Sequence, residues 1–236
     1  MKKPAPRSRA LADLVPPLAG LALVALFVAL GFWQLERAAE KRALAAAFTA
    51  DSPPRAVTSG LVPAPFEHLA ARGRYLAERQ FLIDNIVQDG RLGYYVITPL
   101  ELASGGPLLL VNRGWVARSG EVLPAVRVSG ETRSVTGRAG RLPRVGLRPG
   151  EAFVDDAWPR LATFPTPAEI ASALGRDLLP FVLLADPDPD AGMLRHWAPE
   201  GIGPARHLAY AFQWFALAAT VVAVFVVLEL RRRRAR

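Results

Sequence analysis

Cysteine is absent from the 236-residue sequence, and methionine and histidine are scarce, with two and three copies. Without a thiol the chain cannot form a disulfide, a thiolate zinc site, an iron–sulfur cluster, a covalently attached c-type haem or a cysteine nucleophile. Soft copper sites need cysteine or clustered methionine, so copper delivery also fits this composition poorly. If the protein handles a metal cofactor, histidine is the best ligand that it offers.

Motifs of the common enzyme classes are absent as well. The sequence contains no GxSxG, phosphate-binding glycine loop, HExxH or dinucleotide fingerprint, and no internal repeat. The acidic stretch at 186–192 lacks calcium-loop spacing and is broken by two prolines, which favours a solvated loop. His68 and His196 have no partner at metal-ligand spacing, so we interpret them as surface or packing residues. The chain is therefore not expected to be an enzyme; an anchored enzyme with an unsignalled polar pocket is the alternative.

Two long runs carry no charged residue: 20 residues at 14–33 and 21 residues at 208–228. As helices rising ~1.5 Å per residue, each is long enough to cross the ~30 Å hydrocarbon core of a bilayer. Core helices of soluble proteins rarely need such a run, and here there would have to be two. Charged residues between 36 and 42 separate the first run from the small residues at 45–50, so we expect no signal-peptidase site and a retained anchor.

The net charge of +8, from 29 basic and 21 acidic residues, is concentrated at the two ends. Residues 1–13 hold four basic side chains and one acidic, residues 229–236 hold five and one, and residues 34–207 hold 20 and 19. The positive-inside rule therefore predicts that both tails lie in the cytoplasm and the large loop across the membrane. Because the loop is almost neutral, it offers no basic face for nucleic acid, and the lipid bilayer is the expected partner of the apolar runs.

These features predict the order of the parts. A basic cytoplasmic tail at 1–13 precedes a transmembrane helix at 14–33 and an extracytoplasmic (periplasmic) domain at 34–207. A second transmembrane helix at 208–228 is followed by an Arg-rich cytoplasmic tail at 229–236. No Arg-rich, Ser-rich presequence precedes the first helix, which favours a two-pass protein of a bacterial inner membrane.

The segment between the two runs is predicted to be an α+β, mainly antiparallel-β domain, flanked by the two transmembrane α-helices. The first helix continues through the strong helix formers of 34–48 and ends before SPP at 52–54. One further helix is predicted at 166–174, with Thr166 as cap, Pro167 in the first position and Glu169 completing a capping box. Short runs rich in β-branched and aromatic residues predict strands at 73–76, 80–87, 94–100, 107–116, 133–142 and 178–186.

Three longer patterns occur in order along the chain: GFWQLERAAEKRAL at 31–44, TPLELASGGPLLLVNRGWV at 98–116 and RHLAYAFQWFALA at 206–218. In a two-helix protein with one large outer loop, they resemble the Surfeit-locus family of cytochrome c oxidase assembly factors across nearly the whole chain. The likeness is weaker from 143 to 200, where the Asn-Pro pair common in the family is missing. Arg206 also stands where many members have Asn before the histidine.

The resemblance implies an assembly factor that helps deliver haem a to the large subunit of a haem-copper oxidase, with haem a synthase as a further partner. It also implies that His207, in the third pattern, binds the haem iron. Imidazole is a common axial ligand of haem, and His207 lies where the second helix enters the membrane. A protein–protein scaffold that assists oxidase assembly without binding haem is the alternative.

Further residues become candidates for the haem site through their position relative to His207. Tyr210, Ala211 and Trp214 share its helical face by the i, i+3, i+4, i+7 rule. Under the haem hypothesis Tyr210 and Trp214 flank the ligand, and the small Ala211 leaves room for a flat ring. Alternatively, Tyr210 and Trp214 are ordinary residues of the aromatic belt at the membrane surface.

Three other polar residues have competing interpretations. Arg113 or Arg206 would pair with a haem propionate through a charge-assisted hydrogen bond. Arg113 would otherwise pack structurally at the end of a strand, where Gly114 permits a bulge. Gln213 is expected to bond across to the first helix, with Gln34 as its partner, rather than to touch a ligand.

Overall fold

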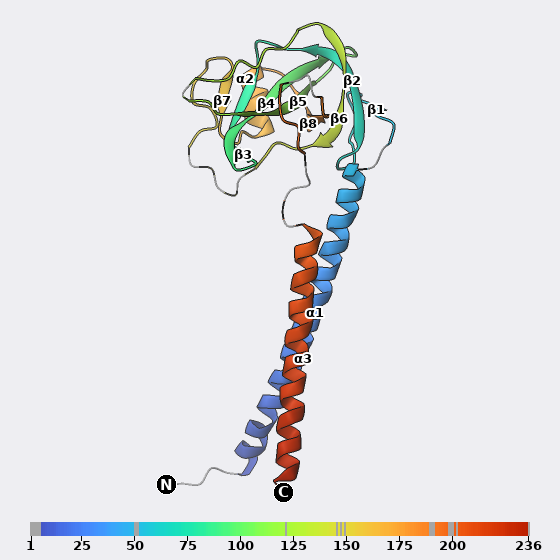
Figure 1. Ribbon diagram of the computed structural model, residues 1–236, viewed down its shortest axis with the longest axis vertical. Coiled ribbons are helices and arrows are strands. Elements are labelled where there is room, and N and C mark those ends of the chain that lie inside the picture. Colours follow the sequence, from blue (N-terminus) through green and yellow to red (C-terminus); the bar gives the residue numbers. More distant parts are fainter. Residues whose placement is uncertain are drawn as a thin grey trace. The chain divides into compact units, whose positions relative to one another are not determined.

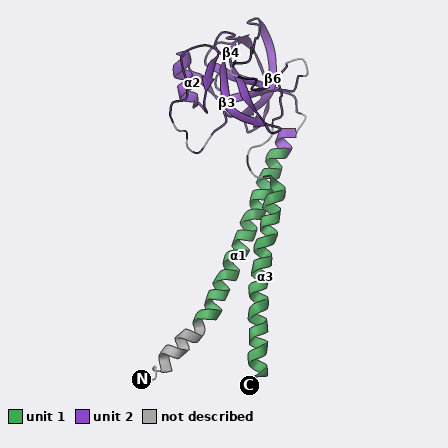
Figure 2. Cartoon of the chain, turned by 60° about the vertical axis from the view of Figure 1, so that its left-hand side comes forward, with its two compact units in different colours: residues 1–45, 199–236 green, residues 46–198 purple. Residues whose placement is uncertain are grey.

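The computed structural model divides the chain into two compact units, Met1–Ala45 with Pro199–Arg236 and Ala46–Ala198 (Figure 2). Residues 1–5 of the predicted N-terminal tail, and the side chains of 6–14, lie outside the part that the structure describes. The same holds for part of the acidic stretch, at 189–191. The described residues are 6–49, 52–120, 122–144, 146, 148, 150–188, 192–197, 201 and 203–235.

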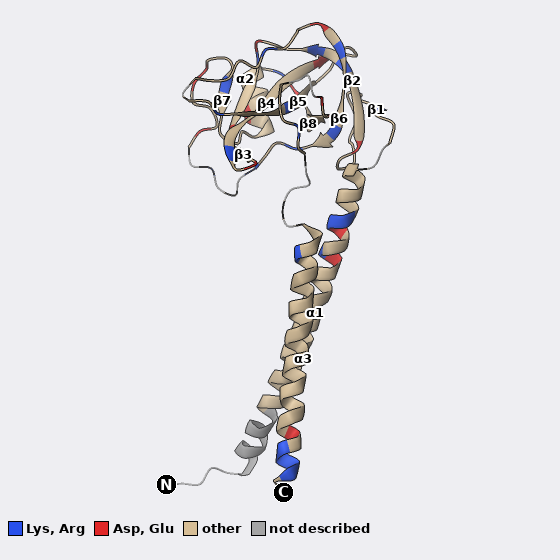
Figure 3. Ribbon diagram, viewed as in Figure 1, with Lys and Arg blue, Asp and Glu red and all other residues tan. Residues whose placement is uncertain are grey.

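The first unit consists of two long helices, α1 (Pro6–Thr49) and α3 (Pro204–Arg234), which run side by side (Figure 1). Both contain a stretch long and apolar enough to cross a membrane, and only 11% of each such stretch is buried within the protein. A buried core helix would hide most of that surface, so these helices anchor the protein in a membrane. Figure 3 shows that their middle parts carry no Lys, Arg, Asp or Glu, whereas arginines gather in the last turn of α3.

The two helices pack along one stripe each, with buried or half-buried positions spaced alternately by three and four residues, as in a left-handed coiled coil. The two helices run antiparallel. Phe27 stacks on Trp214, with ring centroids 5.6 Å apart, whereas Gln34, later in α1, bonds to His207, earlier in α3. Small residues bring the helices close: the ring of Phe215 occupies the space beside Gly31. The stripes are Gly20, Val24, Phe27, Gly31, Gln34, Ala38 and Lys41 on α1, and Pro204, His207, Ala211, Trp214, Ala218 and Val221 on α3.

The second unit is the predicted β-rich domain, and all six predicted strands and the predicted helix are present. Two short strands, β1 and β7, were not predicted, because two or three residues give no periodicity to detect. The strands are β1 (Arg55–Ala56), β2 (His68–Tyr75), β3 (Phe81–Gln88), β4 (Arg91–Leu102), β5 (Leu108–Ala117), β6 (Thr132–Gly140), β7 (Arg160–Ala162) and β8 (Leu178–Ala185), with α2 (Pro167–Leu174) before β8.

Five of the strands form a closed ring. The sheet order is β1-β2-β6-β8-β5-β4-β3-β7, and an additional antiparallel pairing of β2 with β4 closes the ring. Most pairings are antiparallel, as expected; the parallel ones are β1 with β2, β3 with β7 and β5 with β8. The closing pair puts Gly73 opposite Leu102, and an added Cβ at Gly73 would lie only 2.2 Å from the Glu101 carbonyl oxygen. Closure therefore needs glycine at this position.

The alternation of side chains along the strands contributes to three apolar clusters among the described residues, and two of them meet at β5. On β5, Leu109 and Val111 face the cluster inside the ring, whereas Leu110 faces a second cluster outside it. The second cluster is covered by α2 through the fully buried Ile170. Because apolar side chains line both faces of β5 and β8, these strands have nearly continuous apolar sequences.

The predicted capping box of α2 is present. The Thr166 side chain accepts a hydrogen bond from the Glu169 backbone N–H, and the Glu169 carboxylate accepts one from the Thr166 N–H. Arg148 pairs with the same carboxylate at 2.5 Å. Hydrogen bonds from Arg148, followed by that of the Thr166 backbone, lower the pKa of Glu169 from 4.5 to about 2.

Candidate functional site

His207 lies near the start of α3, on the stripe that faces α1, and its side chain is half-buried. Its Nδ1 is 2.7 Å from Oε1 of Gln34. An amide oxygen only accepts hydrogen bonds, so Nδ1 carries the ring proton and donates a hydrogen bond to Gln34 Oε1. The Nε2 atom then bears the ring's free lone pair, and it has no hydrogen-bond partner among the described residues. An imidazole in this tautomer has the lone pair on Nε2 that a metal ligand needs.

The residues around His207 differ from the predicted arrangement in two respects. Ala211 is only 2% exposed, so it is a buried contact of the helix pair and does not leave room for a flat ring. Trp214 lies on the same inward stripe and stacks on Phe27, which ties it to α1. Tyr210 is 42% exposed and faces away from the helix contact. Arg206 is also exposed.

The expected hydrogen bond between Gln213 and Gln34 is wrong. Gln34 bonds to His207, and the side chain of Gln213 is exposed on the outer face of α3. The reason is the helical phase: at 3.6 residues per turn, position 213 is rotated by about 100° from the stripe position 214 and by about 160° from the stripe position 211. One signal in the sequence could have marked Gln34 as a contact residue: it is an uncharged polar residue directly after the first apolar run.

Arg113 lies in the β domain, in the middle of β5, and is 8% exposed. The predicted bulge is present here: Tyr95 pairs with Trp115 and Ile97 with Asn112, which leaves Arg113 and Gly114 opposite a single residue of β4. Gly114 has φ +137°, a conformation open to glycine. The bulge lies within β5 rather than at its end, as β5 continues to Ala117.

The guanidinium of Arg113 is held by hydrogen bonds inside the β domain. Its Nη1 donates to Gln80 Oε1 and to the Val126 carbonyl, both at 2.8 Å, and its Nη2 donates to the Arg127 carbonyl at 2.9 Å. The aromatic ring of Tyr75 lies 5.9 Å from the guanidinium carbon. Burial lowers the pKa of Arg113 below its usual value and raises that of Tyr75. These contacts are those of a structural arginine, and its pairing with a propionate stays a prediction.

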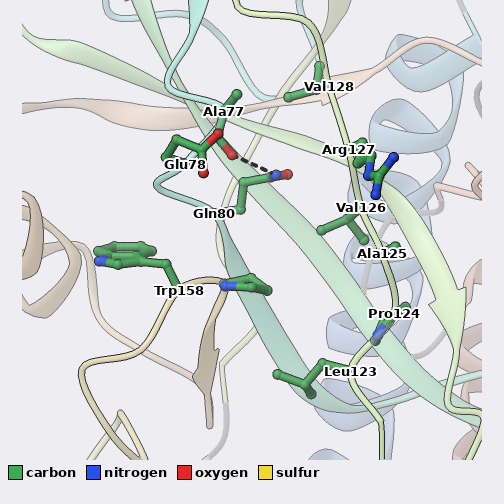
Figure 4. Close-up of a pocket in the computed structure, with 11 residues that line it drawn as sticks. Ala77, Glu78, Gln80, Leu123, Pro124, Ala125, Val126, Arg127, Val128 and Trp158 are labelled. Carbon is green, nitrogen blue, oxygen red and sulfur yellow. Dashed lines mark hydrogen bonds between the residues drawn. The ribbon is translucent and has the colours of Figure 1, made fainter.

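A pocket of about 520 Å³ lies beside this cluster (Figure 4). Its wall contains Gln80, the segment 123–128 and Trp158. Three hydrogen bonds hold the amide of Gln80, since Nε2 donates to the Ala77 carbonyl and Oε1 accepts from both Thr98 and Arg113. The lining carries the carboxylate of Glu78 and the guanidinium of Arg127 but no serine, histidine, aspartate or lysine, so it does not pair a nucleophile with a separate base.

The other two histidines lie in the β domain. His68 at the start of β2 is held by Ser52 O at 2.7 Å and Asp186 Oδ2 at 2.9 Å, as expected of a packing residue. The hydrogen bond to the Ser52 backbone raises the pKa of His68, and Asp186 adds to the effect. His196 has an exposed side chain. No group of three or more potential metal ligands occurs among the described residues.

The chain is thus a two-helix membrane protein. One membrane-anchoring helix precedes the β domain, one follows it, and the second helix carries His207. The model of the SURF1 family matches residues 21–219, and the chain belongs to this family. Membership in this family of assembly factors implies a general role in the assembly of a terminal oxidase.

The chain is also similar in sequence to SURF1-like proteins of a bacterium, a choanoflagellate and an insect. A SURF1-like protein of Rickettsia felis is 23% identical over 214 residues, which covers 86% of this chain and 91% of the relative. One of Monosiga brevicollis is 27% identical over 220 residues, covering 85% and 82%. One of Drosophila melanogaster is 31% identical over 173 residues, covering 63% and 54%. The similarity to the first two therefore extends over both units.

Proposed function

We propose that this protein binds haem a through Nε2 of His207 and assists its insertion into the large subunit of a haem-copper terminal oxidase. The observation that carries the proposal is the hydrogen bond from His207 Nδ1 to Gln34, which leaves Nε2 as a lone-pair donor. Haem a is cargo in this proposal, and haem a synthase is the partner that would supply it.

The chemistry of His207 and of its neighbour Arg206 suits such a ligand. A neutral imidazole whose second nitrogen is hydrogen-bonded is the usual form of a histidine bound to iron. His207 is the one histidine of the helix pair, since His68 and His196 belong to the β domain. The apolar, outward-facing surfaces of the helices would shield the faces of a macrocycle from water, and the exposed Arg206 next to the ligand is suited to a propionate.

Replacing His207 by alanine tests the proposal. We expect the wild-type protein, purified from cells that make haem a, to show the visible spectrum of the bound pigment, and His207→Ala to lose most of it. The matched control is His196→Ala, which removes an exposed histidine of the β domain and should retain the wild-type haem content.

Equal haem a in wild type and His207→Ala would contradict ligation by His207. If the wild-type protein carries no haem a but co-purifies with the large oxidase subunit, the protein is a scaffold and not a haem carrier.

We also propose a two-pass topology in a bacterial inner membrane, with both termini in the cytoplasm and the β domain in the periplasm. The support is the basic last turn of α3, Arg231 to Arg234, because positive residues stay on the cytoplasmic side. The absence of cysteine makes every introduced thiol a unique label.

Cysteine labelling tests this topology. Ser104→Cys, in an exposed turn after β4, should react with a membrane-impermeant maleimide in spheroplasts. Ala235→Cys, just beyond α3, should react only after the membrane is opened. The reverse pattern of labelling would show that the charge rule fails for this protein.

A further inference from the structure

We infer that Gln34 is the positioning residue of the haem ligand: it fixes the protonation and the orientation of His207, and as a neutral acceptor it keeps the ligand weak enough to release its cargo. The inference rests on the proposed function, because it concerns how His207 would hold haem a. It goes beyond it by assigning a function to a residue of the other helix.

The register of the helix pair places Gln34 opposite His207. Phe27 and Gln34 are seven residues apart on α1, and His207 and Trp214 are seven residues apart on α3. Seven residues span two helical turns, about 10.5 Å of rise. The stack of Phe27 on Trp214 therefore fixes the helix register, and the same register brings Gln34 Oε1 to 2.7 Å from His207 Nδ1.

The chemistry of the acceptor determines the strength of the ligand. A hydrogen bond at Nδ1 selects the tautomer with its lone pair on Nε2 and increases the basicity of the ring. A carboxylate acceptor would increase it further, because negative charge stabilises a partly deprotonated imidazole. The amide of Gln34 orients the ring without adding charge, which suits a protein that must later give up its ligand.

A purely structural function for this hydrogen bond is the competing explanation. Polar side chains often join membrane helices, and such a bond would stabilise the pair without affecting iron. The two explanations differ in what they predict for bound haem. A structural bond changes the stability of the helix pair, whereas a positioning bond also changes the iron–histidine stretching frequency and the midpoint potential.

The experiment compares Gln34→Leu and Gln34→Glu with the wild type, each loaded with haem a in detergent. Removing the acceptor in Gln34→Leu should weaken haem a binding about 10-fold or more. The carboxylate introduced by Gln34→Glu should raise the iron–histidine stretching frequency of the ferrous form, lower the midpoint potential and slow transfer of haem a to an apoprotein acceptor. The matched control is Gln213→Leu, which removes the exposed glutamine of α3 and should match the wild type in all four measurements.

The outcomes separate this inference from the proposed function. If His207→Ala keeps its haem a, ligation by His207 fails, whatever the Gln34 variants do. If His207→Ala loses haem a while both Gln34 variants retain the wild-type affinity, stretching frequency and potential, the positioning function of Gln34 is overturned. Should Gln34→Leu fail to assemble, Gln34→Glu, which preserves size and hydrogen bonding, decides the question alone.

Discussion

Replacing Arg113 by leucine is expected to lower the free energy of unfolding of the β domain by about 3 kcal/mol. The variant would remove the donors to the Val126 and Arg127 carbonyls and one of the two donors to Gln80 Oε1. A buried acceptor left without a partner costs about 1–3 kcal/mol, and two carbonyls lose theirs here. The measurement is a urea titration of the detergent-solubilised protein, followed by tryptophan fluorescence.

Two further variants make the Arg113 measurement specific. Arg113→Lys retains the positive charge but replaces the planar, forked guanidinium by a single ammonium, so its stability should be intermediate. Arg72→Leu, on the exposed face of β2, should change the free energy by less than about 0.5 kcal/mol. If Arg113→Leu is as stable as Arg72→Leu, the hydrogen bonds to the Val126 and Arg127 carbonyls do not hold that segment in place.

Gly73→Ala is expected to destabilise the β domain by about 3 kcal/mol or more, although it adds only one methyl group. The added carbon would lie 2.2 Å from the Glu101 carbonyl oxygen, which belongs to the backbone of β4 and cannot rotate away. Relief of the overlap requires β2 and β4 to separate, and their pairing is what closes the ring of strands. The effect is measured by the same urea titration.

The control for this second variant is Gly60→Ala, at a position where an added methyl group meets nothing within 4 Å. There alanine should leave the stability unchanged or raise it by about 0.4–1 kcal/mol, because it restricts the unfolded chain. Hydrogen exchange provides a further measurement: the amides of 100–102 should lose protection in Gly73→Ala and keep it in Gly60→Ala. Equal stability of the two variants would mean that the ring tolerates a wider spacing between β2 and β4.

Local sequence signals were sufficient for most of the elements. Twenty uncharged residues predict a membrane helix wherever they stand, because the thickness of the bilayer sets the length. The Thr166, Pro167 and Glu169 pattern predicted the start of α2, since a capping box involves only residues three apart. The strands β1 and β7 were missed because they exist only through parallel pairing with β2 and β3.

The candidate site could be predicted in part. The sequence and its family resemblance pointed to His207, and the structure gives this residue a fixed Nδ1 and an available Nε2. The surroundings of His207 were less predictable. Helical spacing placed Ala211 on the same face as His207, but it could not show that α1 buries Ala211. A helical wheel shows which residues share a face and cannot show what that face contacts.

The sequence by itself determined that this protein has two membrane anchors around one β-rich domain, and that histidine is its best ligand for a metal. Only the tertiary structure decided which residues meet. Gln34 and His207 are 173 positions apart, and the three groups that hold the guanidinium of Arg113 come from segments 13, 14 and 33 residues away. Runs, caps and strand alternation depend on neighbours in the chain, so a sequence displays them. Hydrogen bonds between distant segments depend on the register of packed helices and strands, which arises only when the whole unit folds.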